Sequence, residues 1–137
     1  MYTIRKTFKF EASHRLMSSF SKCCQTIHGH SYKVELFIST DEFNADGMVI
    51  DFGEVKDWVM PLINSWDHSL ILHEKDPIIK KKMLGRQYKI AKVKFNPTAE
   101  HMAEYIYGYV FNIMPSRIDN IKVRVHETDT GWAEYFE

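Results

Sequence analysis

Two segments near the N-terminus alternate apolar and polar side chains, and this pattern limits the possible fold more than any other feature of the sequence. They run from Tyr2 to His14 and from His28 or His30 to Thr40. Alternate side chains of a β-strand point to opposite faces, so each segment predicts a strand with one buried face. The predicted buried rows comprise Phe8, Phe10, Ala12 and His14 in the first segment, and His28, His30, Tyr32, Val34, Leu36 and Ile38 in the second. We expect the two strands to pair antiparallel.

Three histidines lie on these predicted buried faces. His14 ends the first row, and His28 and His30 begin the second. Pairing of the strands would bring the three imidazoles to one point, where each needs a partner if it is buried. Three neutral imidazoles with one open position are typical of a catalytic zinc site, and imidazole also suits copper, nickel and iron. We therefore predict a metal site at these histidines, with zinc as the preferred ion.

Cys24 precedes His28 by four residues, in a polar loop expected from Arg15 to Ile27. It can be a fourth ligand in a closed structural zinc site, or a nucleophile or general base whose thiolate is favoured by the nearby cation. The pattern leaves both interpretations open. A disulfide with its neighbour Cys23 would be strained, which favours two thiols in a reducing compartment.

The composition restricts the class of protein. With 137 residues the chain is long enough for one substantial core, and we expect a single domain over residues 1–137. It has 18 basic and 18 acidic residues without a long run of either sign, which argues against nucleic acid or a membrane surface as an obligate partner. No apolar stretch approaches the ~18 residues of a spanning helix, and the N-terminus lacks a signal-peptide pattern. We therefore expect a cytoplasmic protein.

The middle of the chain predicts two helices. Asp51 is placed as an N-cap, with Glu54 completing a capping-box pattern. Apolar residues at helical spacing follow it at Val55, Trp58, Val59, Leu62, Ile63 and Trp66. Pro61 lies inside this helix and predicts a kink or a break. The sequence Asn96-Pro97-Thr98 marks the second helix start, and its predicted buried stripe is Ala99, Met102, Ala103, Ile106, Val110 and Ile113.

The remaining segments complete the predicted fold. Between Asp67 and Phe95 we expect only a short helical turn after Pro77 and a short strand near Lys92 to Phe95. Two final strands, Asn120–Glu127 and Trp132–Phe136, are joined by a short turn. The order predicts an α+β fold, ββααββ, in which two helices cover one face of an antiparallel four-stranded sheet. Its open edges favour oligomerisation into a larger sheet or barrel.

Asp67 and His68 directly follow the first helix. They can form a catalytic dyad, which requires irregular backbone because adjacent side chains do not normally face each other. They can also be a polar pair at a helix C-terminus, where the helix dipole favours a histidine cation.

Glu127 continues an apolar row formed by Ile121, Val123 and Val125. A carboxylate at the end of a buried row is costly unless it receives strong donors, and a ligand with two parallel N–H groups would supply them. The alternative is a strand-end residue turned to solvent. His126 shares the polar row with Lys122 and Arg124, so we interpret it as a surface residue. Glu100 lies in the first turn of the second helix, where the dipole favours a carboxylate.

Taken together, six motifs occur in the order seen in the 6-pyruvoyl-tetrahydropterin synthase family, which the chain resembles from about Phe8 to Tyr135. The motifs are Phe10-Glu11-Ala12-Ser13-His14-Arg15-Leu16, Cys24 with His28-Gly29-His30-Ser31-Tyr32, Asp51-Phe52-Gly53-Glu54, Asp67-His68-Ser69-Leu70, Asn96-Pro97-Thr98-Ala99-Glu100 and His126-Glu127-Thr128.

The resemblance implies the tunnelling fold, or T-fold, in which trimers close their sheets into a β-barrel and two trimers commonly stack as a homohexamer. The zinc ligands of the family correspond to His14, His28 and His30. Its catalytic residues correspond to Cys24, Asp67 and His68. Its pterin-contacting positions correspond to Glu127, Thr98 and Glu100, with Ala99 departing from the hydroxyl residue often found between the last two.

The short loop between Cys24 and His28 resembles the bacterial 6-carboxy-tetrahydropterin synthases of the queuosine pathway. That branch implies a zinc-dependent lyase acting on 7,8-dihydroneopterin triphosphate, with 6-carboxy-5,6,7,8-tetrahydropterin, acetaldehyde and triphosphate as products. The alternatives are the pyruvoyl-forming branch, which only eliminates triphosphate, and a non-catalytic zinc-stabilised pterin-binding module.

Overall fold

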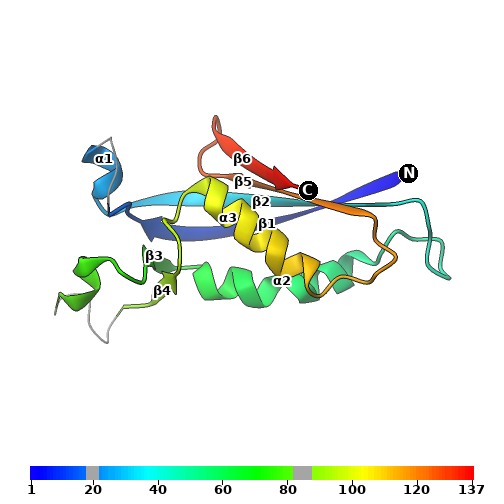
Figure 1. The fold of residues 1–137 in the computed structure, drawn as a ribbon, viewed down its shortest axis with the longest axis horizontal. Helices are drawn as coiled ribbons and strands as arrows, with labels where there is room; N and C mark the ends of the chain where they lie inside the picture. Colours follow the sequence, from blue (N-terminus) through cyan, green and yellow to red (C-terminus); the bar gives the residue numbers. More distant parts are fainter. Residues whose placement is uncertain (18–21, 82–87) are drawn as a thin grey trace.

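A long antiparallel hairpin forms the centre of the sheet and runs along most of the molecule (Figure 1). Its strands are β1 (Tyr2–His14), with the predicted bounds, and β2 (His28–Thr40), which begins at the earlier of its two predicted starts. The computed structural model describes residues 1–17, 22–81 and 88–137. Parts of the expected loop after His14 (18–21) and of the irregular stretch after Asp67 (82–87) therefore lie outside the described residues.

The sheet has six strands in the order β4-β3-β1-β2-β5-β6. On one side of the hairpin, β5 (Asn120–His126) pairs antiparallel with β2, and β6 (Trp132–Phe136) pairs antiparallel with β5. On the other side, β3 (Ser69–His73) pairs parallel with β1, and β4 (Ile90–Val93) pairs parallel with β3. The prediction of a four-stranded antiparallel sheet was wrong in the number of strands and in the parallel pairing of β3 and β4. The first four residues of β3 are all buried, and a short run buried on both faces has no alternation for sequence reading to detect.

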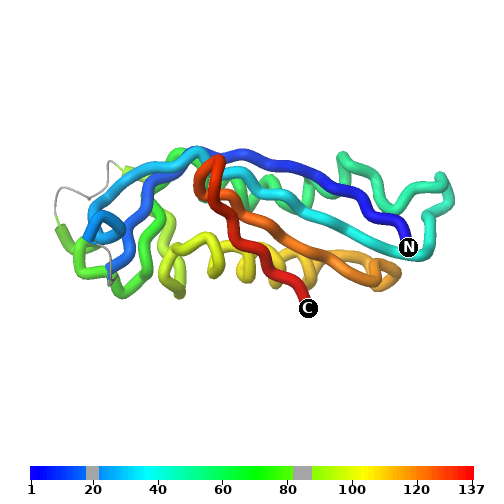
Figure 2. Tube along the Cα trace, turned by 90° about the horizontal axis from the view of Figure 1, so that it is seen from above, coloured from blue at the N-terminus to red at the C-terminus, as the bar shows by residue number. Residues whose placement is uncertain are grey.

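Two helices, α2 (Phe52–Trp66) and α3 (Ala99–Phe111), lie on the same side of the sheet, as predicted (Figures 1 and 2). The sequence predicts a kink or a break at Pro61; the helix α2 continues through this residue, so it is not broken there. The predicted burial of Ile113 was also wrong, because α3 ends before it and its side chain is 44% exposed. The chain also forms two short helices, α1 (Lys22–Gln25) and η1 (Pro77–Lys80).

The start of α2 gives a direct stability test. The Asp51 carboxylate accepts hydrogen bonds from the backbone N–H groups of Gly53 and Glu54. Loss of such a cap costs about 1 kcal/mol, so Asp51→Ala should lower the free energy of unfolding by about that amount in urea. The matched control is Asp57→Ala, which removes an exposed aspartate inside the same helix. Equal effects of the two substitutions would contradict the capping role.

A nearly buried carboxylate lies on the sheet face opposite the helices. Glu35 is 5% exposed, and it accepts hydrogen bonds from Arg5 at 2.9 Å and from His126 Nε2 at 2.8 Å. The interpretation of His126 as a surface residue was therefore wrong, because it packs across the β2–β5 pair onto this carboxylate. Burial alone would raise the pKa of Glu35, but the hydrogen bond from His126 and the neighbouring positive charges outweigh it, so the pKa lies below its ordinary value.

The lowered pKa predicts the pH range in which Glu35 stabilises the fold. Because the folded-state pKa lies below the ordinary value of 4.5, the contribution is present above pH 4.5 and is lost as the pH falls through the folded-state pKa. Glu35→Gln should therefore destabilise the protein at pH 7, and its difference from the wild type in urea unfolding should shrink below pH 4.5. A difference that does not vary with pH would contradict this role.

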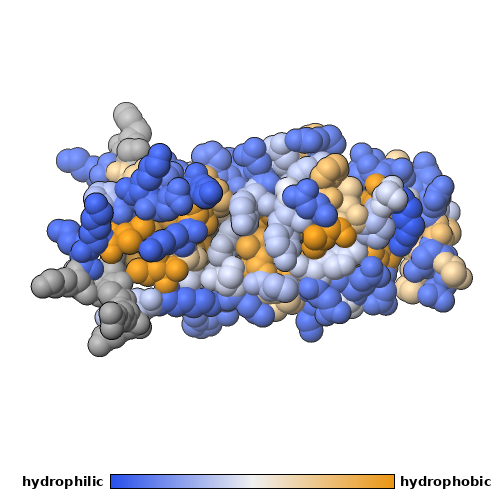
Figure 3. Space-filling view, turned by 60° about the horizontal axis from the view of Figure 1, so that its bottom comes forward, coloured by the Kyte–Doolittle hydropathy of each residue, from blue (hydrophilic) through white to orange (hydrophobic). Residues whose placement is uncertain are grey.

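The side of the molecule seen in Figure 3 is mainly hydrophilic, with several separate apolar patches. Within the described ranges, no helix is both long and apolar enough to cross a membrane.

Candidate metal centre and active site

The three predicted metal-binding histidines meet at the end of the β1–β2 hairpin. His14 and His28 are direct register partners, and His30 lies two residues further along the same face of β2. One nitrogen of each imidazole lies within 4.8 Å of the others, close enough for a shared ion. His14 is only 2% exposed, whereas His28 and His30 are half-buried.

The hydrogen bonds of two rings fix which nitrogen faces the centre. His14 Nδ1 lies 2.7 Å from the Pro97 carbonyl oxygen, and His28 Nδ1 lies 2.6 Å from the Thr26 carbonyl oxygen. A carbonyl only accepts, so both Nδ1 atoms must carry hydrogen, and a neutral imidazole then has only a lone pair at Nε2. The two carbonyl oxygens therefore orient the Nε2 atoms so that their lone pairs can bind a metal.

The residues present fit a zinc ion. The Nε2 atoms of His14 and His28 are 3.1 Å apart, and two lone pairs at this distance repel each other unless a cation lies between them. Tetrahedral ligands at Zn–N distances of ~2.0–2.1 Å are themselves separated by about 3.3 Å. Burial lowers the pKa of His14 and of His30, which favours the neutral imidazoles that bind metal.

A cavity of about 360 Å³ opens beside this centre and brings together the predicted site residues other than His30, Asp67 and His68. Its lining includes His14, His28, Cys24, Thr98, Glu100 and Glu127. Cys24 comes from α1 and Glu127 from the residue after β5. Thr98 is the N-cap of α3, where its hydroxyl accepts a hydrogen bond from the His101 backbone N–H. The segments that supply these side chains are distant in sequence, and the long hairpin brings them together.

Asp67 and His68 form a dyad after the end of α2. His68 Nδ1 lies 2.9 Å from Asp67 Oδ2. The irregular backbone that this pairing requires is present, because His68 has a positive φ of 54°. The Glu11 backbone N–H donates to Asp67 Oδ1 at 2.9 Å. This bond and that from His68 hold the pKa of Asp67 below its ordinary value.

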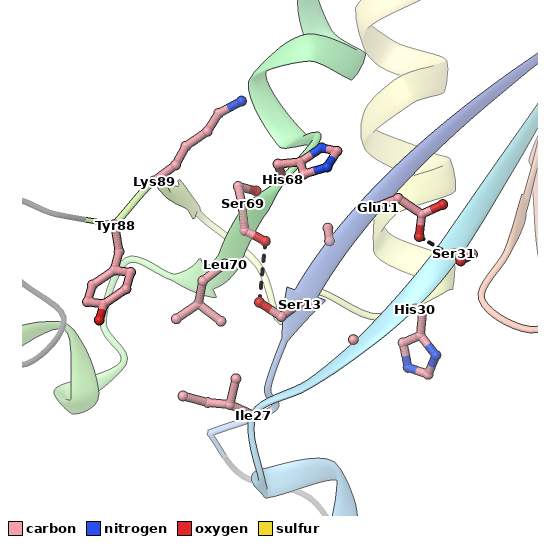
Figure 4. Close-up of a pocket in the computed structure, with 12 residues that line it drawn as sticks. Glu11, Ser13, Ile27, His30, Ser31, His68, Ser69, Leu70, Tyr88 and Lys89 are labelled. Atoms are coloured by element: carbon pink, nitrogen blue, oxygen red, sulfur yellow. Dashed lines mark hydrogen bonds between the residues drawn. The ribbon is translucent and has the colours of Figure 1, made fainter.

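His68 of the dyad lines a different hollow from Cys24. Figure 4 shows this second cavity, of about 660 Å³, where β1, β2 and β3 meet. His68, Ser69 and Leu70 line it from one side, and the His30 ring points away from Leu70 and Tyr88. Cys24 is not among its described lining residues, and His68 is not among those of the smaller cavity. Within one chain the structure therefore does not bring Cys24 and the dyad into one pocket.

Sequence reading missed two kinds of residue at this site. Pro97 and Thr26 act through main-chain carbonyl oxygens, which any residue type can supply, so no sequence signal could have identified them. Tyr32 was assigned only to the buried face. Its ring centroid lies 5.6 Å from that of His30 and 6.0 Å from that of His14.

The fold and the site place this chain in the class of T-fold proteins with a three-histidine centre. The sequence profile of the 6-pyruvoyl tetrahydropterin synthase family matches residues 3–137. The chain belongs to that family. The prediction of an enzyme is confirmed at this level, since the family and its named relatives are synthases.

Relatives with curated names refine the comparison. A 6-carboxy-5,6,7,8-tetrahydropterin synthase of Aquifex aeolicus is 34% identical, over 99% of this chain and 98% of its own. A protein of the same name from Haemophilus influenzae is 33% identical over the full length of both chains.

Solved structures share the fold. An uncharacterized protein of Wolinella succinogenes superimposes with a TM-score of 0.84 at 21% identity, over 99% of this chain and 98% of its own. The 6-pyruvoyl tetrahydropterin synthase of Plasmodium vivax does so with a TM-score of 0.77 at 18% identity, over 100% of this chain and 99% of its own. At these low identities, the superpositions establish only that the folds are alike.

Proposed function

We propose that this protein is a zinc-dependent 6-carboxy-5,6,7,8-tetrahydropterin synthase of the queuosine pathway, acting in the cytoplasm. As a lyase it would convert 7,8-dihydroneopterin triphosphate into 6-carboxy-5,6,7,8-tetrahydropterin, acetaldehyde and triphosphate. The observation that carries the proposal is one cavity shared by His14, His28, Cys24 and Glu127. The names of the relatives from Aquifex aeolicus and Haemophilus influenzae support this choice of branch.

Each side chain around the cavity has a role that its chemistry permits. His14, His28 and His30 would hold zinc, which when bound polarises the side-chain oxygens of the substrate and acidifies neighbouring C–H and O–H groups. Glu127 would accept the parallel N–H groups of the pterin's amino-pyrimidine edge. Cys24, as a thiolate, would take a proton from the substrate side chain.

Thr98 and Glu100 line the same cavity and would contact the pterin. The hydroxyl of Thr98 also caps α3, so a contact through its backbone keeps the cap intact. Glu100 is exposed in the first turn of this helix, and its carboxylate is available to a ligand.

The position of the dyad favours an active site shared between chains. Asp67 would stabilise the His68 imidazolium while His68 exchanges protons with Cys24. His68 and Cys24 line different cavities of one chain, which favours their joint action across the interface of two subunits. Oligomerisation is therefore part of the proposed function.

The edges of the sheet suggest how such an oligomer forms. In the described part of the chain, β1 pairs with β3 only over Ala12–His14, which leaves the rest of that edge open. The strand β6 forms the opposite edge of the antiparallel part. Open edges of this kind pair with other strands, so β6 of one subunit would extend β1 of the next. Repetition of this pairing closes a barrel, and we propose a trimer or a dimer of trimers.

Chelation separates the enzyme from a zinc-stabilised binding module. A structural zinc site folds only with its metal, whereas this site rests on a core built from two helices and a sheet. Treatment with a chelator should therefore abolish consumption of 7,8-dihydroneopterin triphosphate and leave the circular dichroism spectrum folded. Added zinc should restore turnover. Unfolding on chelation, or zinc-loaded protein without turnover, would contradict the proposal.

A further inference from the structure

Tyr32 lies directly behind the metal centre. Its side chain is 1% exposed, and its ring stacks on Phe10 with the planes 8° apart and the centroids at 4.7 Å. The rings of His14 and His30 approach it edge-on. Aromatic packing on these sides fixes the ring, so its hydroxyl has a defined position.

The Tyr32 hydroxyl has no hydrogen-bond partner among the described residues. A buried hydroxyl without a partner costs free energy, and most buried polar atoms in proteins are paired. The buried Nε2 atom of His30 also makes no hydrogen bond within the described part of the chain. Two such atoms on one strand, beside a candidate metal centre, indicate that their partners belong to the functional site.

Glu127 lies next to Tyr32 across the sheet. Lys33 of β2 is the register partner of His126, so the next residue of each strand, Tyr32 and Glu127, come opposite each other on the same face. The phenol O–H of Tyr32 is a donor and the carboxylate of Glu127 accepts, so this placement pairs a donor, unpartnered among the described residues, with a neighbouring acceptor.

Metal binding changes the partners available to Glu127. In the structure, Glu127 Oε1 lies 3.4 Å from His30 Nε2. When Nε2 gives its lone pair to a metal it carries no hydrogen, so His30 cannot donate to the carboxylate. We propose that Tyr32 is a positioning residue, whose buried hydroxyl then donates a hydrogen bond to Glu127 and holds the carboxylate towards a ligand with two N–H donors. The identity of that ligand as a pterin rests on the proposed function.

The first test measures stability and metal content. Tyr32→Phe removes only the hydroxyl, and because that hydroxyl lacks a partner in the metal-free fold, the melting temperature without metal should not fall. Zinc content should stay at the wild-type value, because Tyr32 is not a ligand. Tyr107→Phe is the matched control: Tyr107 is 8% exposed and packs on Tyr135. A metal-free Tyr32→Phe protein that melts clearly below both the wild type and this control would show a structural hydroxyl and overturn the proposal.

The second test is a double-mutant cycle on ligand binding, with neopterin as the probe and zinc-loaded protein in the calorimeter. Tyr32→Phe should weaken binding about tenfold, as expected for a lost hydrogen bond to a charged group, and Tyr107→Phe should leave it unchanged. In a Glu127→Ala background, Tyr32→Phe should have no further effect.

The outcomes separate this inference from the proposed function. If Glu127→Ala alone leaves neopterin binding unchanged, the assignment of Glu127 in the proposed function fails, and the inference fails with it. If Glu127→Ala weakens binding and Tyr32→Phe has no effect, or has the same effect in both backgrounds, the positioning role alone is overturned.

Discussion

Replacing Cys24 with alanine should reduce turnover of 7,8-dihydroneopterin triphosphate by about 10²- to 10⁴-fold, the range that a positioned general acid or base contributes. Cys24 lines the cavity beside His14 and His28, where the charge of a bound zinc ion favours the thiolate. The three histidines would supply three ligands, which would leave one position open for substrate. The zinc content of Cys24→Ala, measured by inductively coupled plasma mass spectrometry, should therefore equal that of the wild type.

Cys23→Ala is the control for this substitution. The sulfurs of Cys23 and Cys24 are 4.0 Å apart on the same short helix. Cys24 lines the cavity, whereas Cys23 is not among its described lining residues. Cys23→Ala should therefore keep most of the activity. If Cys24→Ala loses its zinc, the cysteine is a fourth ligand, and the proton-transfer role is wrong.

The second large effect is expected from His14→Ala, which should lose both zinc and activity. His14 is the most buried of the three histidines, and its hydrogen bond to the Pro97 carbonyl fixes its ring. A catalytic zinc site with three protein ligands has no replacement for a missing one. The zinc stoichiometry of purified protein should fall towards zero, and kcat should fall below detection even with added zinc.

His73→Ala is the control, because His73 ends β3 and lies outside the metal group. It should retain zinc and turnover. Full zinc occupancy in His14→Ala would contradict the three-histidine centre, whatever its activity.

The sequence predicted the central hairpin well because physical chemistry leaves little freedom there. Alternation along each strand determines the buried face of β1 and β2 and, to within two residues, their bounds. The strand expected near Lys92 to Phe95 overlaps β4 (Ile90–Val93), but its parallel pairing was not predicted. The strand β3 is short and pairs in parallel with residues distant in sequence, so no local period reveals it. His126 was misassigned for a related reason, since its burial depends on Glu35 across the sheet.

The same distinction applies to the site: local patterns predicted some of its residues, whereas other features depend on tertiary contacts. The three histidines and Glu127 were predicted because each extends a buried row of its strand, which is a local property. The pairing of Asp67 with His68 depends on the positive φ of His68, which no periodicity encodes. The orienting carbonyls have no side-chain signature, and the relation of Cys24 to the dyad depends on how chains assemble.

The most direct test of the proposed function is to identify the reaction products. Zinc-loaded protein is incubated with 7,8-dihydroneopterin triphosphate, and acetaldehyde and the pterin mass are measured in the same sample. The protein should form equimolar acetaldehyde and 6-carboxy-5,6,7,8-tetrahydropterin. Release of triphosphate without acetaldehyde would contradict it and place the protein in the pyruvoyl-forming branch.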